Sequence, residues 1–314
     1  MSSVASPADL VADQLATARP ASLWRDTLAN ILRQRNAQMG LVILAVLVFF
    51  AVFADQLSAF GPNDVLLGQE EGVKRLSPPC LHALGCAPTK VEHIFGLDGN
   101  ARDEFSRVIH GAQISLWIGF ATVTFAILIG SLIGLIAGYA EGPLDSILMR
   151  TMDVVLVFPS LLLAIAIVAA LGPSLLNAQI AIGVVAIPIY ARVMRASVLS
   201  VKENGFVTAS RALGEGAAGL MFRRILPNAV TPIIVTGTLG IATAVLEVAA
   251  LSFLGLGAQP PLAEWGSMIG QERGHLFTAA HLIIFPGIFL SLTVFGFNLL
   301  GDGLRDALDP RLNR

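Results

Sequence analysis

Charged residues are scarce in this chain of 314 residues, because only 13% are Asp, Glu, Lys or Arg while 55% are hydrophobic. A soluble domain carries about 25% charged residues. The composition, with a mean hydropathy of +0.74, therefore excludes an ordinary soluble protein and predicts one membrane-embedded domain. The net charge of −2 leaves no basic surface of the density that nucleic-acid binding needs, so we expect no nucleic-acid partner.

Catalytic motifs are also missing. Only three lysines occur, Lys74, Lys90 and Lys202, and none follows a glycine, so the phosphate-binding pattern GxxxxGK[ST] is absent. The run Gly214–Gly219 formally reads GxGxxG, but no strand precedes it, which argues against dinucleotide binding. HExxH and GxSxG are absent as well. We therefore expect a non-catalytic chain with no cofactor or metal site of its own.

Long apolar runs dominate the chain instead. A bilayer core about 30 Å thick needs roughly 20 apolar residues in a helix, and only helices satisfy their own backbone in lipid. We predict an all-α polytopic membrane protein with six transmembrane helices: Met39–Phe60, Gln113–Tyr139, Ile147–Leu171, Leu175–Ala196, Asn228–Leu256 and Phe277–Leu300.

The distribution of basic residues predicts the orientation of these spans. With both termini inside, 14 of the 20 Lys and Arg residues lie on cytoplasmic segments. Five of the other six lie in one long outer loop, where charge has little effect on orientation. We therefore expect both termini, and the segment between the fourth and fifth spans, to be cytoplasmic.

The segment before the first span is amphipathic. Leu23, Trp24, Leu28, Ile31 and Leu32 fall on one helical face, with polar and basic residues mostly on the other. A basic amphipathic helix that ends at a span favours an elbow lying in the membrane interface. The alternative is a nascent helix in a flexible tail.

Cysteine is limited to Cys80 and Cys86, both in the long outer loop. Because that loop faces an oxidising space, we expect them to form a disulfide. Free thiols are the second possibility. A metal site with His82 and His93 is the least favoured, since the spacing is not that of a usual zinc site.

Placing an ionisable residue inside a membrane span costs free energy, so such residues are functional candidates. Glu247 in the fifth span and Asp153 near the inner end of the third are the main ones. Asp153 could pair locally with Arg150. Glu247 could either line a transport pathway or pack against a neighbouring helix.

The segment 206–228 between the fourth and fifth spans resembles the coupling loop of ABC importer permeases. That pattern runs Glu-Ala-Ala, three residues, Gly, nine residues, Ile, one residue, Leu-Pro. Here Thr208, Ala209 and Ser210 take the first positions, Gly214 the glycine, and Leu226-Pro227 the end, while Arg224 replaces Ile and Thr208 replaces Glu. The resemblance implies that Phe206, Val207, Thr208, Ala209, Ser210, Arg211, Leu213, Gly214, Leu226 and Pro227 contact an ATPase.

The small residues of this loop also suit a helix tip that a partner approaches closely. We expect a short helix within Val201–Gly214, broken at Gly214–Gly219 and stopped at Pro227. A partner that closes on ATP could push such a helix and tilt the attached spans. The simpler alternative is a plain cytoplasmic loop.

A second run, from His93 to Leu116, resembles the dipeptide, oligopeptide and nickel importers, whose permease carries a similar run before its second span. Asp98-Gly99-Asn100 is turn chemistry, and Arg102, Asp103, Glu104 and Arg107 could pair across a helical turn. We expect an ordered cap with a structural and substrate-entry role. The alternative is an interfacial helix with solvated charges.

Further motifs from Met39 to Arg311 are similar to the C-type permease of that group, including Phe158-Pro159, Leu251–Gly257, Phe285-Pro286-Gly287 and Gly301–Asp306. The resemblance implies a type I ABC importer permease fold in the plasma (inner) membrane of a bacterium or archaeon. It also implies four partners: a homologous B-type permease, two ATP-binding subunits that hold ATP and Mg²⁺, and an extracytoplasmic substrate-binding protein for peptides.

The predicted segments follow one another along the chain. It comprises a disordered cytoplasmic tail (1–20), an interfacial helix (21–38), the first span (39–60), an extracytoplasmic loop (61–112), a core permease domain (113–300) with the coupling loop at 200–227, and a cytoplasmic tail (301–314). Two other functions are alternatives: an ion-coupled secondary transporter with Glu247 as its proton site, and an intramembrane enzyme, for which no nucleophile and base can be assembled.

Overall fold

The computed structural model describes residues 34–69, 73–88 and 90–308 of the chain. Regular structure within these ranges is helical, apart from two isolated bridges that pair Cys80 with His93 and Leu97 with Asp103. The long helices are α3 (Arg35–Val52), α5 (Glu104–Ala140), α8 (Leu175–Lys202), α12 (Thr231–Phe253) and α14 (His281–Leu308). The shorter elements are α4 (Ala54–Leu57), η1 (His82–Leu84), α6 (Gly142–Val157), α7 (Ser160–Leu171), α9 (Gly205–Ala212), α10 (Ala217–Gly219), η2 (Leu220–Ile225), α11 (Leu226–Ala229), α13 (Trp265–Glu272) and η3 (Arg273–His275).

Five of these helices are long and apolar enough to cross a membrane, and α6 with α7 makes a sixth span in the described residues if the pair is counted as one. The third predicted span, Ile147–Leu171, is not one continuous helix. It breaks at Phe158-Pro159, where α6 and α7 meet at 91°. Proline lacks the backbone donor that would continue α6 and disfavours helical backbone in the residue before it, which explains the break.

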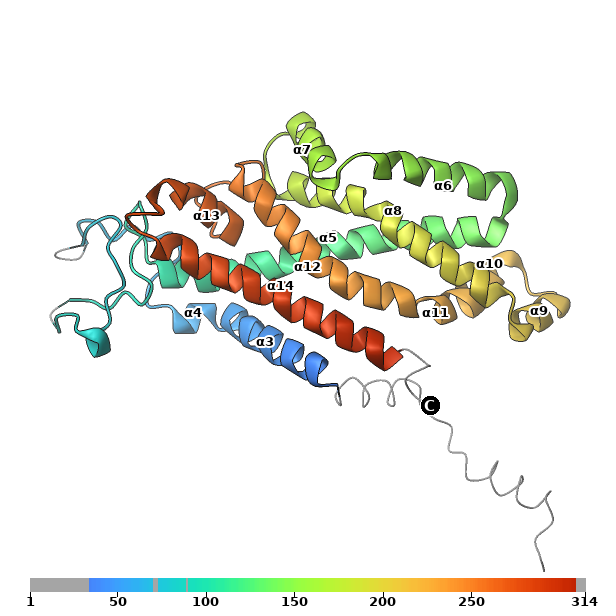
Figure 1. Cartoon of the computed structure of the whole chain (residues 1–314), viewed down its shortest axis with the longest axis horizontal. Helices are drawn as coiled ribbons and strands as arrows, with labels where there is room; N and C mark the ends of the chain where they lie inside the picture. Colours follow the sequence, from blue (N-terminus) through green and yellow to red (C-terminus); the bar gives the residue numbers. More distant parts are fainter. Residues whose placement is uncertain (1–33, 70–72, 89, 309–314) are drawn as a thin grey trace, which may run out of the picture.

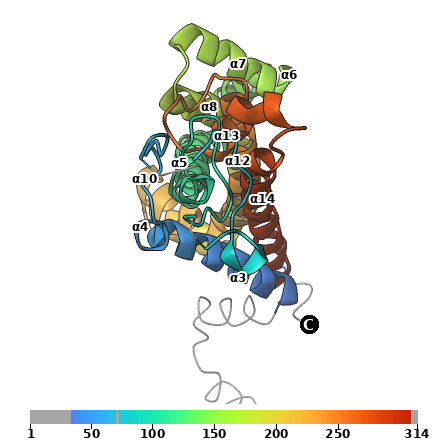
Figure 2. The same ribbon diagram turned by 90° about the vertical axis from the view of Figure 1, so that its left-hand side faces the viewer.

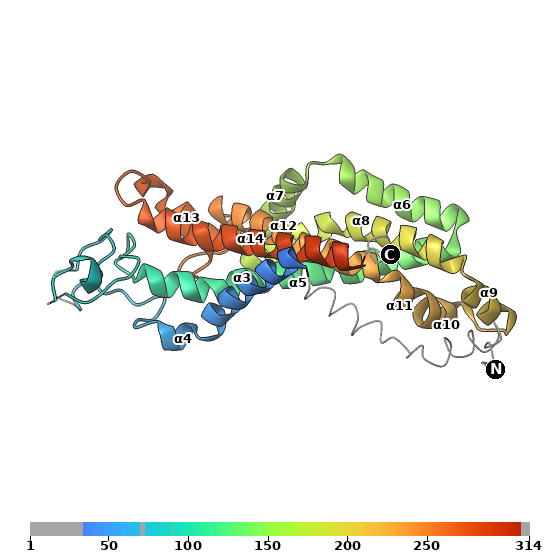
Figure 3. The ribbon, with the colours of Figure 1, turned by 60° about the horizontal axis from the view of Figure 1, so that its bottom comes forward.

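The molecule is an elongated bundle in which the long helices run roughly along its length (Figure 1). The outer loop and α13 lie at one end, and α9, α10 and α11 lie at the other, an arrangement that Figure 3 also shows. Seen from the loop end, α6 and α7 lie on one side of the bundle and α3 on the opposite side (Figure 2).

Close packing of α5 against α8 forms the centre of the bundle. A Cβ atom on Gly130, Gly134 or Gly138 would lie 2.6, 2.3 or 3.0 Å from a backbone oxygen of α8, those of Ile187, Ala191 and Arg195 respectively. These steps of four residues on both helices are typical of membrane helices that pack through small residues. The glycines of α5 therefore have a definite packing role.

Several predicted boundaries differ from the observed ones. Helix α5 begins at Glu104, nine residues before the predicted Gln113, because Asp103 caps it from within the outer loop. Helix α14 continues to Leu308, past the predicted end at Leu300. Pro188 and Pro286 do not interrupt α8 and α14, which continue through them. The predicted interfacial helix lies almost wholly outside the described residues, as does the tail 1–20.

Candidate functional site

The predicted coupling residues form a small helical projection at the end of the bundle opposite the outer loop (Figure 1). Helix α9 carries Phe206 to Arg211, and Leu213 follows as its C-cap. Phe206, Thr208, Ala209, Arg211 and Leu213 are exposed, with Leu213 88% accessible. An apolar side chain so exposed beside a basic one gives α9 a mixed surface suited to contact with a partner protein.

Helix α9 is nevertheless anchored to the bundle through its buried face. Val207 is fully buried and packs in one cluster with Met194, Val198 and Val201 of α8 and with Leu220 and Ile225 of η2. Val207, which the resemblance implies as an ATPase contact, therefore anchors the projection to the bundle. Its neighbours Phe206 and Thr208 are exposed, so Val207 connects an accessible surface to α8.

The turn after α9 depends on Gly214. Its φ of +86° is a left-handed conformation that glycine adopts without strain, and the Gly214 N–H donates to the Arg211 carbonyl oxygen at 3.0 Å. Glu215 then accepts a hydrogen bond from Arg224 Nε at 2.9 Å, which ties the turn to η2. Arg224, the departure from the expected Ile, therefore has a structural partner.

Pro227 does not stop the helix as predicted. It is the second residue of α11, directly after the π-helical segment η2. Helical backbone continues from Ala217 through η2, a π-helical segment, to Ala229. The predicted stop instead falls at Val230, just before α12.

Asp153 pairs with a different arginine from the one predicted. Its Oδ1 lies 2.5 Å from Arg192 Nη2 of α8, across the space between helices, and not against Arg150 on its own helix. A second pair, Asp145 with Arg195, makes two hydrogen bonds of 2.6 Å. Both acidic residues of α6 thus fasten that helix to α8.

Glu247 lies on the wall of a cavity of about 530 Å³ between α5, α6, α7, α8 and α12. Its Oε1 accepts a hydrogen bond of 3.0 Å from the Ser160 hydroxyl, at the break of the third span. The ion pairs of the described residues include none to Glu247. Of the two alternatives drawn from the sequence, the geometry fits a lining position better than a packed one.

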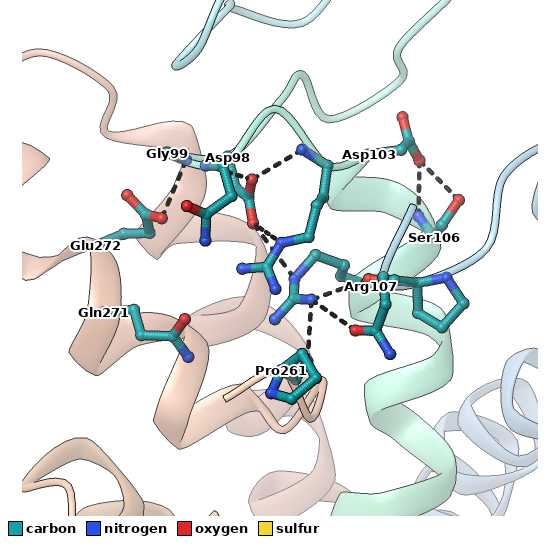
Figure 4. Close-up of polar contacts among 12 residues, drawn as sticks. Asp98, Gly99, Asp103, Ser106, Arg107, Pro261, Gln271 and Glu272 are labelled. Atoms are coloured by element: carbon teal, nitrogen blue, oxygen red, sulfur yellow. Dashed lines mark hydrogen bonds and ion pairs between the residues drawn. The ribbon is translucent and has the colours of Figure 1, made fainter. Parts of the chain in front are cut away.

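The charged residues before the second span are buried rather than solvated. Asp98, Arg102, Asp103, Glu104 and Arg107 are each at most 5% exposed. Asp98 accepts from the backbone N–H groups of Asn100 and Arg102 at 2.8 Å and from Arg102 Nε at 2.7 Å (Figure 4). The predicted alternative of a surface helix with solvated charges is therefore wrong, and an ordered cap is present.

Arg107 joins three parts of this cap. Its Nη1 donates to the carbonyl oxygens of Pro62 at 2.9 Å and of Pro261 at 3.3 Å (Figure 4). Glu272 at the end of α13 accepts from the Gly99 N–H at 3.1 Å. The outer loop, the start of α5 and the segment before α14 thus form one hydrogen-bonded unit.

Helix α13 is fixed by two further buried groups. Trp265 donates from Nε1 to the Val108 carbonyl oxygen at 2.9 Å. Glu264 caps the helix by accepting from the N–H groups of Gly266 at 3.0 Å and Ser267 at 2.8 Å. Burial raises the pKa of the Glu264 carboxyl above its usual value, against the opposing effect of these hydrogen bonds.

The outer loop joins Cys80 to Cys86 as a disulfide, with Cα atoms 5.4 Å apart. His82 contacts Glu92 and the Lys90 carbonyl oxygen, whereas His93 Nδ1 lies 2.9 Å from Asp103 Oδ1. In the ranges that the structure describes, no three His, Cys, Asp or Glu residues gather where they could hold a metal ion.

Several functional residues were not identified from the sequence. Ser160 beside Glu247, the Asp145–Arg195 pair and the bridging role of Arg107 all depend on segments distant in the chain. The polar residues at positions 236, 243 and 247 of α12 share a helical face, which was a usable signal. The sequence carried no signal for the pairings themselves, because local spacing does not specify contacts between helices.

Comparison with known proteins agrees with this arrangement. Residues 130–314 match the family described as binding-protein-dependent transport system inner membrane component, and residues 22–79 match the N-terminal TM domain of oligopeptide transport permease C. The chain is 44% identical to the dipeptide transport system permease protein of Alkalihalophilus pseudofirmus, over 93% of this chain and 91% of that protein. It is 43% identical to the di/tripeptide transport system permease protein of Pseudomonas aeruginosa, over 88% and 89% respectively.

A solved structure gives the fold. The inward-facing MetNI methionine ABC transporter has a chain that aligns with a TM-score of 0.53 and 20% identity, covering 64% of this chain and 96% of that one. Helical spans in this arrangement constitute the type I ABC importer permease fold. None of these relatives is named as an ion-coupled transporter. The chain belongs to the family of binding-protein-dependent transport system inner membrane components, the permease subunits of ABC importers.

Proposed function

We propose that the chain is the C-type permease of an ATP-driven importer of di- or oligopeptides and forms half of its translocation pathway. The single observation that carries the coupling role is the pairing of an exposed α9 surface with a fully buried anchor at Val207. The peptide class is supported by the names of the two relatives, which align over about nine-tenths of the chain.

In this proposal the chain itself is not catalytic and holds no cofactor. Two ATP-binding subunits hold ATP and Mg²⁺ and press on α9, a homologous B-type permease completes the pathway, and an extracytoplasmic binding protein delivers peptide. The termini and α9 face the cytoplasm of a bacterium or archaeon. The cap, formed by the outer loop, the start of α5 and the segment before α14, faces outward, where the binding protein would dock.

Transmission follows from the contacts of α9. A rigid helix moves as a unit, and Val207, Leu220 and Ile225 connect it to α8 and to the segment leading into α12. Displacement of α9 would therefore tilt the spans that carry Tyr190 and Glu247 on the cavity wall. Such a change is the rigid-body class of switching motion.

Charge reversal at Arg211 tests the coupling surface. We expect Arg211→Glu to reduce co-purification of the ATP-binding subunits from mild detergent and to lower ATP-driven peptide uptake by about tenfold. Arg75→Glu is the matched control, because Arg75 is exposed in the outer loop, and it should leave co-purification unchanged.

Equal recovery of the ATP-binding subunits with wild type and Arg211→Glu, together with normal uptake, would contradict coupling through α9. Purification of the wild-type chain alone, with uptake that follows an ion gradient, would instead favour the secondary transporter.

A further inference from the structure

The cavity beside Glu247 has a polar stripe along one of its walls. Thr236, Gly240, Thr243 and Glu247 all line it from α12. Their spacings of four, three and four residues put them on one helical face. From Thr236 to Glu247 the stripe spans roughly 16 Å at 1.5 Å per residue, which is about the length of five residues of extended peptide.

The chemistry of the stripe favours hydrogen-bond donors as ligands. The Thr236 hydroxyl already donates to the Pro232 carbonyl oxygen at 2.9 Å, so its oxygen is left to accept. On the facing helix α5, Thr122 is 2% exposed, and its hydroxyl has no hydrogen-bond partner among the described residues. Because Thr122 lines the cavity, a bound ligand is one group that can satisfy this hydroxyl.

Glu247 is the only carboxylate among the residues that line the cavity. A carboxylate can accept about four hydrogen bonds, and Ser160 is the one side-chain donor that the described structure supplies to it. Glu247 is half-buried, and a carboxylate inside a membrane span without a cation is unfavourable. A mobile cation that enters with the substrate would compensate it only while transport is under way.

A peptide carries such a cation at its N-terminus. Its α-ammonium group has three N–H donors, whereas its backbone N–H groups suit hydroxyl oxygens spaced along a groove. We propose that Glu247 binds the N-terminal ammonium group of the transported peptide, with the peptide backbone lying along the stripe toward Thr236. This inference rests on the proposed function and adds a specificity-determining residue to it.

The position of Ser160 gives this binding a structural consequence. Ser160 begins α7 immediately after the break at Phe158-Pro159, and Phe158 also lines the cavity. The ammonium group and the Ser160 hydroxyl then donate to the same Glu247 carboxylate. Peptide binding is thereby linked to the bend between α6 and α7.

The test compares two peptides in liposomes that contain the whole complex with its binding protein. Trialanine has an N-terminal ammonium, and lactyl-dialanine replaces it with a hydroxyl of similar size. Uptake is measured at saturating binding protein loaded with each peptide, so that selection by the binding protein is removed from the rate. We expect Glu247→Gln to slow uptake of trialanine about tenfold or more, since bonds between charged groups are the stronger ones, and to leave lactyl-dialanine within about twofold.

Two further variants separate charge from structure. Glu247→Asp keeps the carboxylate and should restore most of the preference for trialanine. Asp302→Asn likewise neutralises a carboxylate, at an exposed site near the end of α14, and should change neither rate.

Equal slowing of both peptides by Glu247→Gln, or slowing of neither, would overturn the ammonium site. The proposed function fails separately, if wild-type liposomes take up neither peptide in a manner that requires ATP and the binding protein. ATP hydrolysis stimulated by the loaded binding protein is recorded for each variant, and its retention in Glu247→Gln shows that coupling is intact.

Discussion

Individual glycines decide how close the central helices come. Gly134 faces the Ala191 carbonyl oxygen so directly that a Cβ atom there would lie 2.3 Å from it and 2.8 Å from Met194 Cβ. Backbone atoms cannot move aside as a flexible side chain can. A methyl group at this position would therefore force α5 away from α8.

We accordingly expect Gly134→Ala to lower the apparent melting temperature of the detergent-solubilised protein, with a destabilisation of about 1–3 kcal/mol from overpacking. Gly287 in α14 is the matched control, since a Cβ there meets nothing within 4 Å. Gly287→Ala should be neutral or stabilising by up to about 1 kcal/mol, because alanine is the better helix former. A similar loss in both variants would mean that helix propensity or detergent, and not the close approach, is responsible.

A second residue-scale effect concerns pH. Because burial raises the pKa of Glu264 in the folded protein, the folded state binds this proton more tightly than the unfolded state does. The resulting stability is fully present below the unfolded pKa of about 4.3 and is lost as pH rises through the higher folded value. Glutamine at this position does not titrate.

The apparent melting temperature of Glu264→Gln minus that of wild type should therefore increase as pH rises through that window and level off above it. Thermal unfolding of both proteins across a pH series, in one detergent, measures the difference. A difference independent of pH would show that the Glu264 proton is held equally in both states.

At the scale of elements, the projection formed by α9 depends on its closing turn. Proline cannot adopt the φ of +86° found at Gly214, and it would also remove the N–H that bonds to Arg211. Gly216 is different, because its φ of −69° is one that proline prefers. The two glycines lie two residues apart in the same exposed turn.

We expect Gly214→Pro to abolish ATP-driven uptake while the protein still inserts, and Gly216→Pro to retain uptake within about threefold of wild type. Uptake and the amount of protein in the membrane fraction are measured together. Full activity in Gly214→Pro would show that the position of α9 does not matter for transport.

The bent third span is attached to the bundle by polar pairs as well as by apolar packing. Asp145 and Asp153 fasten α6 to α8 through Arg195 and Arg192, whereas α7 turns away at 91°. Apolar length predicted a span over Ile147–Leu171. The Phe158-Pro159 pair marked the break, but its angle depends on how α7 packs against α8.

At the scale of the whole molecule, the cap and the α9 projection lie at opposite ends of the bundle (Figures 1 and 3). Helix α5 has 37 residues, a length of about 55 Å that exceeds the roughly 30 Å bilayer core. Its first turns, with Glu104 and Arg107, therefore extend beyond the lipid into the cap.

Two exposed residues test this orientation. Leu213 beside α9 is 88% exposed and Phe277 before α14 is 97% exposed. With Cys80 and Cys86 replaced by serine, a membrane-impermeant maleimide added to intact cells should label Phe277→Cys, and should label Leu213→Cys only after permeabilisation. The reverse pattern would invert the topology, and with it the proposed contact between α9 and cytoplasmic ATPases.

Local information in the sequence was sufficient for the class of protein and the order of its elements. Apolar length predicts spans because lipid offers the backbone no hydrogen bonds, and charge bias predicts orientation. The α9 turn at Gly214 also follows from local chemistry, since only glycine is free in that conformation. The same is true of the break at Pro159.

Tertiary structure alone decided which distant groups meet. The burial of Arg107 between Pro62 and Pro261, the pairing of Asp153 with Arg192, and the position of Glu247 beside Ser160 join segments that no local period connects. Helix packing chooses such partners through the fit of small residues and the need to satisfy buried polar groups. That need is met only when the bundle is assembled, which is why the cavity and the contacts that hold the cap together could not be derived from the sequence.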